Sequence, residues 1–120
     1  MKNIFLVLVL ALIFRATAKA QTCDDLPANF RSYNEATRAI QNTSFVLTDE
    51  LPFGKSSWFL SAAYYSCDNY FGYLVYSTQD RKEHILEGVP LKVWTEFKTA
   101  KVTVTYYIQN VKGKYRMVPD

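Results

Sequence analysis

The segment SWFLSAAYYSCDNYFGYLVYST, residues 57–78, decides the fold of this 120-residue chain. Residues 57–65 and 70–78 are rich in aromatic and β-branched side chains, which favour strands. The Ser-Cys-Asp-Asn sequence between them, at 66–69, is typical of a tight turn. We therefore expect a β-hairpin. One face of it is expected to carry the alternating residues Trp58, Leu60, Ala62, Tyr64, Phe71, Tyr73 and Val75.

On the N-terminal side, the pattern predicts a helix. Apolar residues recur at three- and four-residue steps between Asp24 and Asn42, and polar residues occupy the other positions. Asp24 or Asp25 can cap this helix, and Pro27 fits its first turn because proline has no N–H to leave unpaired there.

On the C-terminal side, a short third strand is expected at 83–86, after a polar turn at 79–82. A second helix is expected from Pro90, with Trp94 and Phe97 packed on the sheet. Residues 102–108 have strand propensity. The predicted fold is therefore α+β: an N-terminal helix, a three-stranded antiparallel β-meander, a helix, and a short extended or strand-like tail.

The first twenty residues have the layout of a secretory signal. Lys2 is followed by eleven apolar residues at 4–14, and small residues at 18 and 20 precede Gln21. A membrane anchor needs about 20 consecutive apolar residues, and Arg15 ends this block earlier. We expect residues 1–20 to be removed, leaving a secreted or periplasmic protein with no stable membrane insertion.

Removal of the signal changes the charge of the chain. The full chain has 14 Lys and Arg against 11 Asp and Glu, but three basic residues leave with the signal, so 11 basic residues remain against 11 acidic ones. The basic excess therefore belongs to the signal and does not indicate a polyanion-binding body.

The two cysteines, Cys23 and Cys67, form an even pair in a chain expected to enter an oxidising compartment. A disulfide between them would close a 44-residue separation and stabilise the domain by about 3 to 4 kcal/mol in the chain-entropy model. Two unpaired thiols are the alternative.

The search for chemistry gives no catalytic set, cofactor motif or metal site. His84 is the only histidine, and its mid-strand position is typical of a structural, solvent-facing side chain. A metal site needs more ligands than one histidine and two distant cysteines supply. The acidic pairs Asp24-Asp25 and Asp49-Glu50 suit helix capping and loop solvation.

Aromatic and lysine residues supply a candidate binding surface. The sequence has nine Tyr, eight Phe and two Trp, most of which a small domain needs for its core. Some tyrosines should nevertheless be exposed beside the lysines near the C-terminus, where they could stack on a ligand. The candidate surface consists of Lys98, Tyr107, Lys112, Gly113, Lys114 and Tyr115. The alternative is that the Lys-Gly-Lys-Tyr segment only closes the fold.

Several short motifs resemble a known family. They are Ser56-Ser57-Trp58, Ala63-Tyr64-Tyr65, Gly88-Val89-Pro90, Trp94-Thr95-Glu96-Phe97, Tyr106-Tyr107 and Val111-Lys112-Gly113-Lys114-Tyr115. In this order they resemble the bacterial KTSC domain, which is named for its place at the C-terminus of some lysyl-tRNA synthetases. The resemblance implies a three-stranded sheet, a helix and a closing Lys-Gly-Lys-Tyr segment. It implies no established activity, although nucleic-acid binding has been suggested for the family.

The resulting domain organisation is a signal at 1–20, an N-terminal helical extension at 21–55 and a KTSC-like domain at 56–117. The functional hypothesis is a non-enzymatic, exported binding module for an unknown protein or envelope ligand. A nucleic-acid-binding domain is the alternative, disfavoured by export and by the zero net charge of the mature chain. An enzyme of unrecognised type is a third possibility, with His84 as its only obvious group that titrates near neutrality.

If residues 1–20 are a signal, the accumulated protein should begin at Gln21, free or cyclised to pyroglutamate. Intact-mass analysis and N-terminal sequencing of the exported protein measure this directly. A mature chain that retains Met1 or Lys2 contradicts export by this signal.

Overall fold

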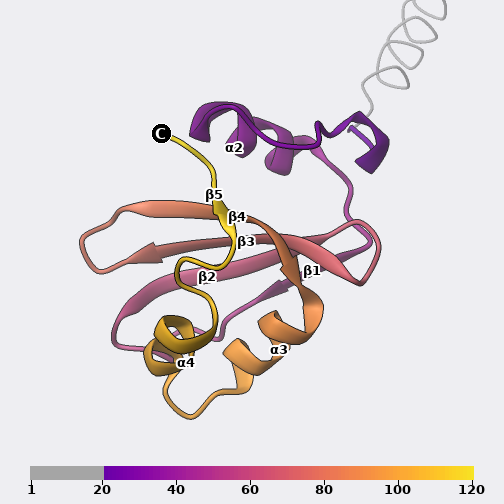
Figure 1. The fold of residues 1–120 in the computed structure, drawn as a ribbon. Helices are drawn as coiled ribbons and strands as arrows, with labels where there is room; N and C mark the ends of the chain where they lie inside the picture. The colour runs from indigo at the N-terminus through magenta and orange to yellow at the C-terminus, as the bar shows by residue number, and fades with distance from the viewer. Residues whose placement is uncertain (1–20) are drawn as a thin grey trace, which may run out of the picture.

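The computed structural model describes residues 21–120, and the signal expected at 1–20 lies outside the described residues. The elements form an α+β arrangement (Figure 1). In chain order they are the 3-10 helix η1 (Cys23–Asp25), α2 (Tyr33–Asn42), β1 (Leu47–Glu50), β2 (Phe59–Ser66), β3 (Phe71–Thr78), β4 (Glu83–Pro90), α3 (Leu91–Thr99), α4 (Thr103–Asn110) and β5 (Arg116–Met117).

The strands form one antiparallel sheet in the order β1-β2-β3-β4-β5, so each pairs with its neighbour in the chain. This confirms the α+β class. The predicted three-stranded meander corresponds to β2, β3 and β4 but leaves out both edges of a five-stranded sheet. β1 reads Leu-Thr-Asp-Glu and β5 is two residues long, so neither carries a strong strand pattern.

The hairpin of β2 and β3 forms as expected, but its register differs from the prediction. Tyr64 pairs with Leu74, so residues 67–71 make the connection. The expected turn at 66–69 implies a register offset by three positions, and an odd offset moves every β3 side chain to the other face. Leu74 and Tyr76 therefore share the face of Tyr64, whereas Tyr73 and Val75 lie on the opposite face.

The start of β2 also departs from simple alternation. The register shifts between Phe59 and Ser61, and this irregularity turns Phe59 into the core. Trp58 and Leu60, which the pattern places on the core face, are instead largely exposed.

The N-terminal helix begins later than predicted. Leu26, just before Pro27, has extended dihedrals, as expected for a residue that precedes proline. Ser32 then caps α2 by accepting a hydrogen bond from the backbone N–H of Glu35 at 3.2 Å. Residues 26–32 form an irregular, bent segment, which we call the strap, and Phe30 of the strap is completely buried.

The tail is a helix rather than the predicted strand. Thr103, Tyr107 and Val111 are buried and recur four residues apart, which is the spacing of one helix face. The β-branched residues of this segment favour a strand locally, but packing of that face on the sheet outweighs the local preference. The second predicted helix is present as α3, with Trp94 and Phe97 buried against the sheet.

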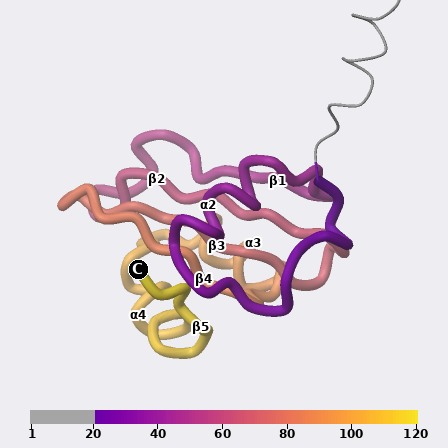
Figure 2. Tube along the Cα trace, turned by 90° about the horizontal axis from the view of Figure 1, so that it is seen from above, coloured from indigo at the N-terminus to yellow at the C-terminus, as the bar shows by residue number. Residues whose placement is uncertain are grey.

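Helices cover both faces of the sheet, with α2 and the strap on one face and α3 and α4 on the other (Figure 1). The core on the α3/α4 face is the larger one and contains Phe59, Ala62, Tyr64, Leu74, Tyr76, Leu86, Val89, Trp94, Phe97, Tyr107 and Val111. The core on the α2 face contains Phe30, Ala36, Ile40, Ile85 and Val118. Seen from above, the loop between β1 and β2 lies to one side of α2 (Figure 2).

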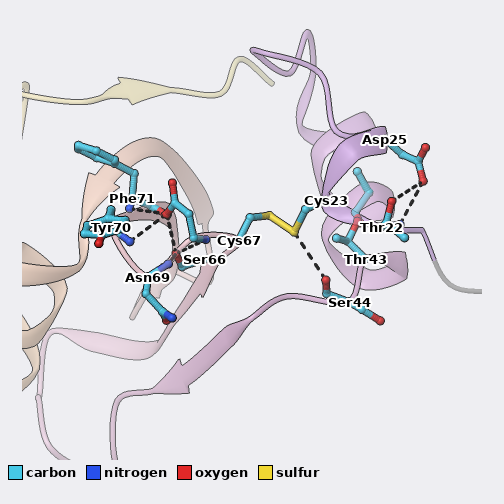
Figure 3. The surroundings of a disulfide bond; sticks show 12 residues. Thr22, Cys23, Asp25, Thr43, Ser44, Ser66, Cys67, Asn69, Tyr70 and Phe71 are labelled. Atoms are coloured by element: carbon cyan, nitrogen blue, oxygen red, sulfur yellow. Dashed lines mark hydrogen bonds between the residues drawn. A yellow bond between two sulfur atoms is a disulfide. The ribbon is translucent and has the colours of Figure 1, made fainter.

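A disulfide joins η1 to the β2–β3 turn (Figure 3). The Cα atoms of Cys23 and Cys67 are 5.9 Å apart. The turn is ordered by its own side chains, since the Asp68 carboxylate accepts hydrogen bonds from the backbone N–H groups of Phe71 and Tyr70 at 3.0 and 2.9 Å. These bonds lower the pKa of Asp68. The N-terminal layer is therefore anchored to a rigid turn.

Loss of the disulfide should destabilise the domain strongly. Cys67→Ser removes a link across 44 residues, which is worth about 3 kcal/mol, and should lower the melting temperature by roughly 10 °C or more. Cys23→Ser and the double variant should match it, because all three lose the same bond. Two freely titrating thiols in the native, unreduced protein would contradict the bridge.

Candidate ligand-binding groove

The Lys-Gly-Lys-Tyr segment forms an exposed turn after α4. Gly113 has a positive φ of 76°, a conformation that glycine adopts without strain. Lys112 and Lys114 are exposed on either side of it. Tyr115 is partly buried and packs against the core of the α3/α4 face. The turn therefore presents two cations to solvent while the tyrosine fixes it to the domain.

The other two residues of the predicted surface lie elsewhere. Tyr107 is a core residue, 5% exposed, and its hydroxyl is hydrogen-bonded to that of Tyr76. It cannot contribute to a recognition face, which corrects that part of the prediction. The ammonium group of Lys98 lies 2.9 Å from both carboxylate oxygens of Asp49 and is already paired within the protein.

A groove lies on the α2 face of the sheet, on the side of β1 and β2. Two adjoining hollows of about 340 and 180 Å³ share Tyr65, Val75 and Glu83, so they form one continuous feature. We call it the α2 groove. Its remaining walls come from α2 (Thr37, Ile40, Gln41), from β1 and the following loop (Glu50, Leu51, Phe53), and from β2 and β4 (Leu60, Ser61, Ala62, Ala63, Ile85).

The sheet register builds the floor of the groove. Ala63 pairs with Glu50 on one side and Val75 on the other, and Val75 pairs with Ile85. Cross-strand partners point to the same face of a sheet, so Glu50, Ala63, Val75 and Ile85 form one row across four strands. The middle of this row is apolar and one end carries a carboxylate.

The rim of the groove carries two exposed apolar side chains. Phe53, in the loop after β1, is 100% exposed, and Leu60 is 47% exposed. Both line the groove. Exposed side chains of this size around a hollow are typical of a contact surface, because they gain most when a ligand covers them.

Glu50 and Glu83 give the groove its charge. Within residues 21–120, the ion pairs are Arg31–Glu35, Lys98–Asp49 and Arg116–Glu87, so neither groove carboxylate has a cationic partner there. Among the described residues, the side chain of Glu83 accepts one hydrogen bond, from the Tyr33 hydroxyl. Burial, together with the negative charges of Glu50 and Glu83, raises the pKa of Tyr65 between them. The groove is therefore apolar at its floor and negative at its sides.

One buried hydroxyl, on a residue of the α2 wall, lacks a hydrogen bond among the described residues. Thr37 Oγ1 is inaccessible to solvent and makes no hydrogen bond of acceptable geometry among the described residues. It lies close enough to the Tyr33 hydroxyl to lower the pKa of that group slightly, against the larger opposing effect of Glu83. Buried polar atoms are normally paired, so this hydroxyl is an exception, and its burial keeps it out of reach of a ligand in the groove.

Asp49 and Glu50 are adjacent in the sequence, but the strand directs their side chains to opposite faces of the sheet. Both were candidates for capping or loop solvation, but they lie on β1 and point to opposite faces. Asp49 accepts hydrogen bonds from Trp94 Nε1 and Lys98. Burial acts to raise its pKa, but these two hydrogen bonds, the backbone N–H of Glu50 and the positive charge of Lys98 together outweigh burial and lower the pKa. Glu50 faces the groove and is free of such partners in the described part of the chain.

A second hollow of about 300 Å³ lies between the strap and the β2–β3 turn. Its charges are matched: the Glu87 side chain is only 6% exposed, pairs with Arg116, and accepts the backbone N–H of Phe30 at 3.0 Å. This carboxylate fastens the strap and β5 to β4. Because Glu87 already has the Phe30 N–H and Arg116 as partners, we assign it a structural role.

Neither the histidine nor a cluster of metal ligands belongs to the α2 groove as the structure describes it. His84 is on the opposite face of the sheet, 5.3 Å from the ring of Tyr76. Among residues 21–120, no three His, Cys, Asp or Glu side chains are grouped closely enough to hold a metal ion. What the groove offers a ligand is an apolar surface, hydroxyl groups and two carboxylates.

Comparison of the chain with protein-family models, with curated proteins and with solved structures found no match. In the region that the structure describes, no helix has both the length and the apolar character needed to cross a membrane.

The electrostatics of the groove can be tested on Tyr65. Glu50→Gln and Glu83→Gln should each lower the pKa of its hydroxyl, and the double variant should lower it further, because each removes a negative charge that opposes ionisation. The measurement is a pH titration of the Tyr65 ring signals by NMR. Glu96→Gln, on α3 across the sheet, is the matched control and should leave this pKa unchanged. An unaltered pKa in the double variant would place the two carboxylates away from the groove.

Proposed function

We propose that this protein is an exported, non-enzymatic binding module and that the α2 groove is its binding site. The observation that carries the proposal is the combination, in one hollow, of an apolar floor with two carboxylates that lack a cationic partner in residues 21–120. Ligand sites are characteristically apolar with a few well-placed polar groups. The exposed rim residues Phe53 and Leu60 support the same reading.

Export is part of this proposal, and the disulfide between Cys23 and Cys67 supports it, since such bonds persist in oxidising compartments. Membership of the KTSC domain family is also part of this proposal, but the resemblance does not indicate which ligand is bound. Nucleic-acid binding is the alternative function. The turn at Lys112 and Lys114 is the feature that favours it, whereas the negative sides of the α2 groove would repel phosphates.

Filling the groove should abolish binding. In Ala63→Phe, a large side chain replaces a half-buried alanine on the floor, and β-propensity tolerates the change. Small apolar fragments screened by NMR should shift the amide signals of Ala63 and Val75 in the wild type and lose at least tenfold in affinity for the variant.

Two controls separate this site from other surfaces. Thr105→Phe adds a similar bulk to an exposed position of α4 on the opposite face of the sheet, and should bind as the wild type does. Lys112→Glu with Lys114→Glu reverses the exposed basic turn and should also leave fragment binding unchanged. Fragments that gather at the basic turn, or that bind Ala63→Phe undiminished, would show that the recognition face lies outside the groove.

A further inference from the structure

We propose that the occupant of the α2 groove is a peptide segment in which a lysine or arginine side chain adjoins apolar side chains. This inference rests on the proposed function and names the chemistry of the partner. Three features of the groove lead to it: the size of its apolar floor, the placement of its charges and the free edge of β1.

The floor fits side chains rather than a large ligand. Each of the two hollows, of about 340 and 180 Å³, has room for one or two side chains, and even together they lie in the lower half of the range for whole drug-sized ligands. Ala63 and Val75 present a shallow apolar surface between the walls formed by Ile40 and Leu60. One or two aliphatic or aromatic side chains can lie there, and Phe53 is free to cover them.

The charges select a cation. Glu50 is on β1 and Glu83 on β4, three inter-strand spacings apart and two residues out of line along the strand, so their backbones are separated by about 16 Å. Both side chains line the same hollow and both act on Tyr65. Both carboxylates are exposed, and a positive group seated between them gains from both, whereas a negative one is repelled by both.

The edge of the sheet favours a peptide over a small organic cation. β1 is the end strand, and within the described residues it pairs on one side only, with β2. Its outer backbone N–H and C=O groups are therefore open to an added extended segment. Glu50 is the last residue of this strand and also borders the groove. A segment that runs along β1 can place its side chains directly on the groove floor.

The test is selection from a random dodecapeptide phage library on the immobilised protein, followed by affinity measurement of the selected peptides. Selected sequences should be enriched in lysine or arginine next to apolar residues. Their affinity should fall at least tenfold for the double variant Glu50→Gln, Glu83→Gln, and should fall with rising salt. The matched control, Asp24→Asn with Glu96→Gln, removes two exposed carboxylates elsewhere and should bind like the wild type.

Comparison with Ala63→Phe distinguishes failure of this inference from failure of the proposed function. One outcome is that the peptides lose affinity for Ala63→Phe but bind the double glutamine variant normally. The groove would then still be the binding site, but its preference for cations would be overturned. A library that yields no groove-dependent peptide overturns both. Self-association of the wild type that Ala63→Phe abolishes, measured by analytical ultracentrifugation, would make a second copy the occupant and overturn the peptide assignment. Circular dichroism melting of each variant verifies that it is folded.

Discussion

The pairing of Ser66 with Gly72, which closes the β2–β3 hairpin, is the constraint on which the rest of the structure depends. Ser66 is completely buried, and its hydroxyl donates a hydrogen bond to the Phe71 carbonyl at 2.7 Å. A Cβ at position 72 would lie 2.3 Å from the Tyr65 carbonyl oxygen and 2.8 Å from the Tyr64 ring, so only glycine fits. Once this pair is fixed, the register of both strands follows.

That register assigns each side chain to one of two layers. Tyr64 and Leu74 go to the α3/α4 face, where the larger core forms. Tyr65 and Val75 go to the α2 face, where a ten-residue helix and the strap cannot cover the whole sheet. The α2 groove is the uncovered remainder. Its apolar floor is a direct result of building both faces of the hairpin from aromatic and aliphatic residues.

Much of the fold could be predicted from local pattern. The alternating aromatic segments predicted the hairpin, although not its register, and the spacing of Trp94 and Phe97 predicted α3. An even pair of cysteines indicated the disulfide that the structure contains. The failures have physical causes. For α4 the prediction rested on local β-propensity alone and did not use the four-residue spacing of Thr103 and Tyr107, which reflects packing on the sheet.

The site itself was beyond local pattern because its parts are distant in sequence. Glu50 and Glu83 belong to strands at opposite sides of the hairpin, and they share a hollow only through the register that joins β1 to β4. The sequence offered one usable signal. Leu47 and Leu51, just before Pro52, are an even number of positions apart, which is the spacing of side chains on one face of a strand, and this could have indicated an edge strand. Lys98 and Tyr107 were assigned to a surface by charge and residue type, but their partners, Asp49 and Tyr76, lie far away in the chain.

The buried carboxylate of Glu87 has a consequence for the order of folding. It holds the strap through Phe30 and the end of the chain through Arg116, so the two termini of the domain meet at one residue of β4. Such contacts between distant parts of a chain form late, because closing long loops costs entropy before any contact repays it. Until Arg116 arrives, Glu87 has no cation to offset its burial. We therefore expect the strap to gain its full stability on β4 only once Arg116 has paired with Glu87, whereas the disulfide can join η1 to the β2–β3 turn earlier.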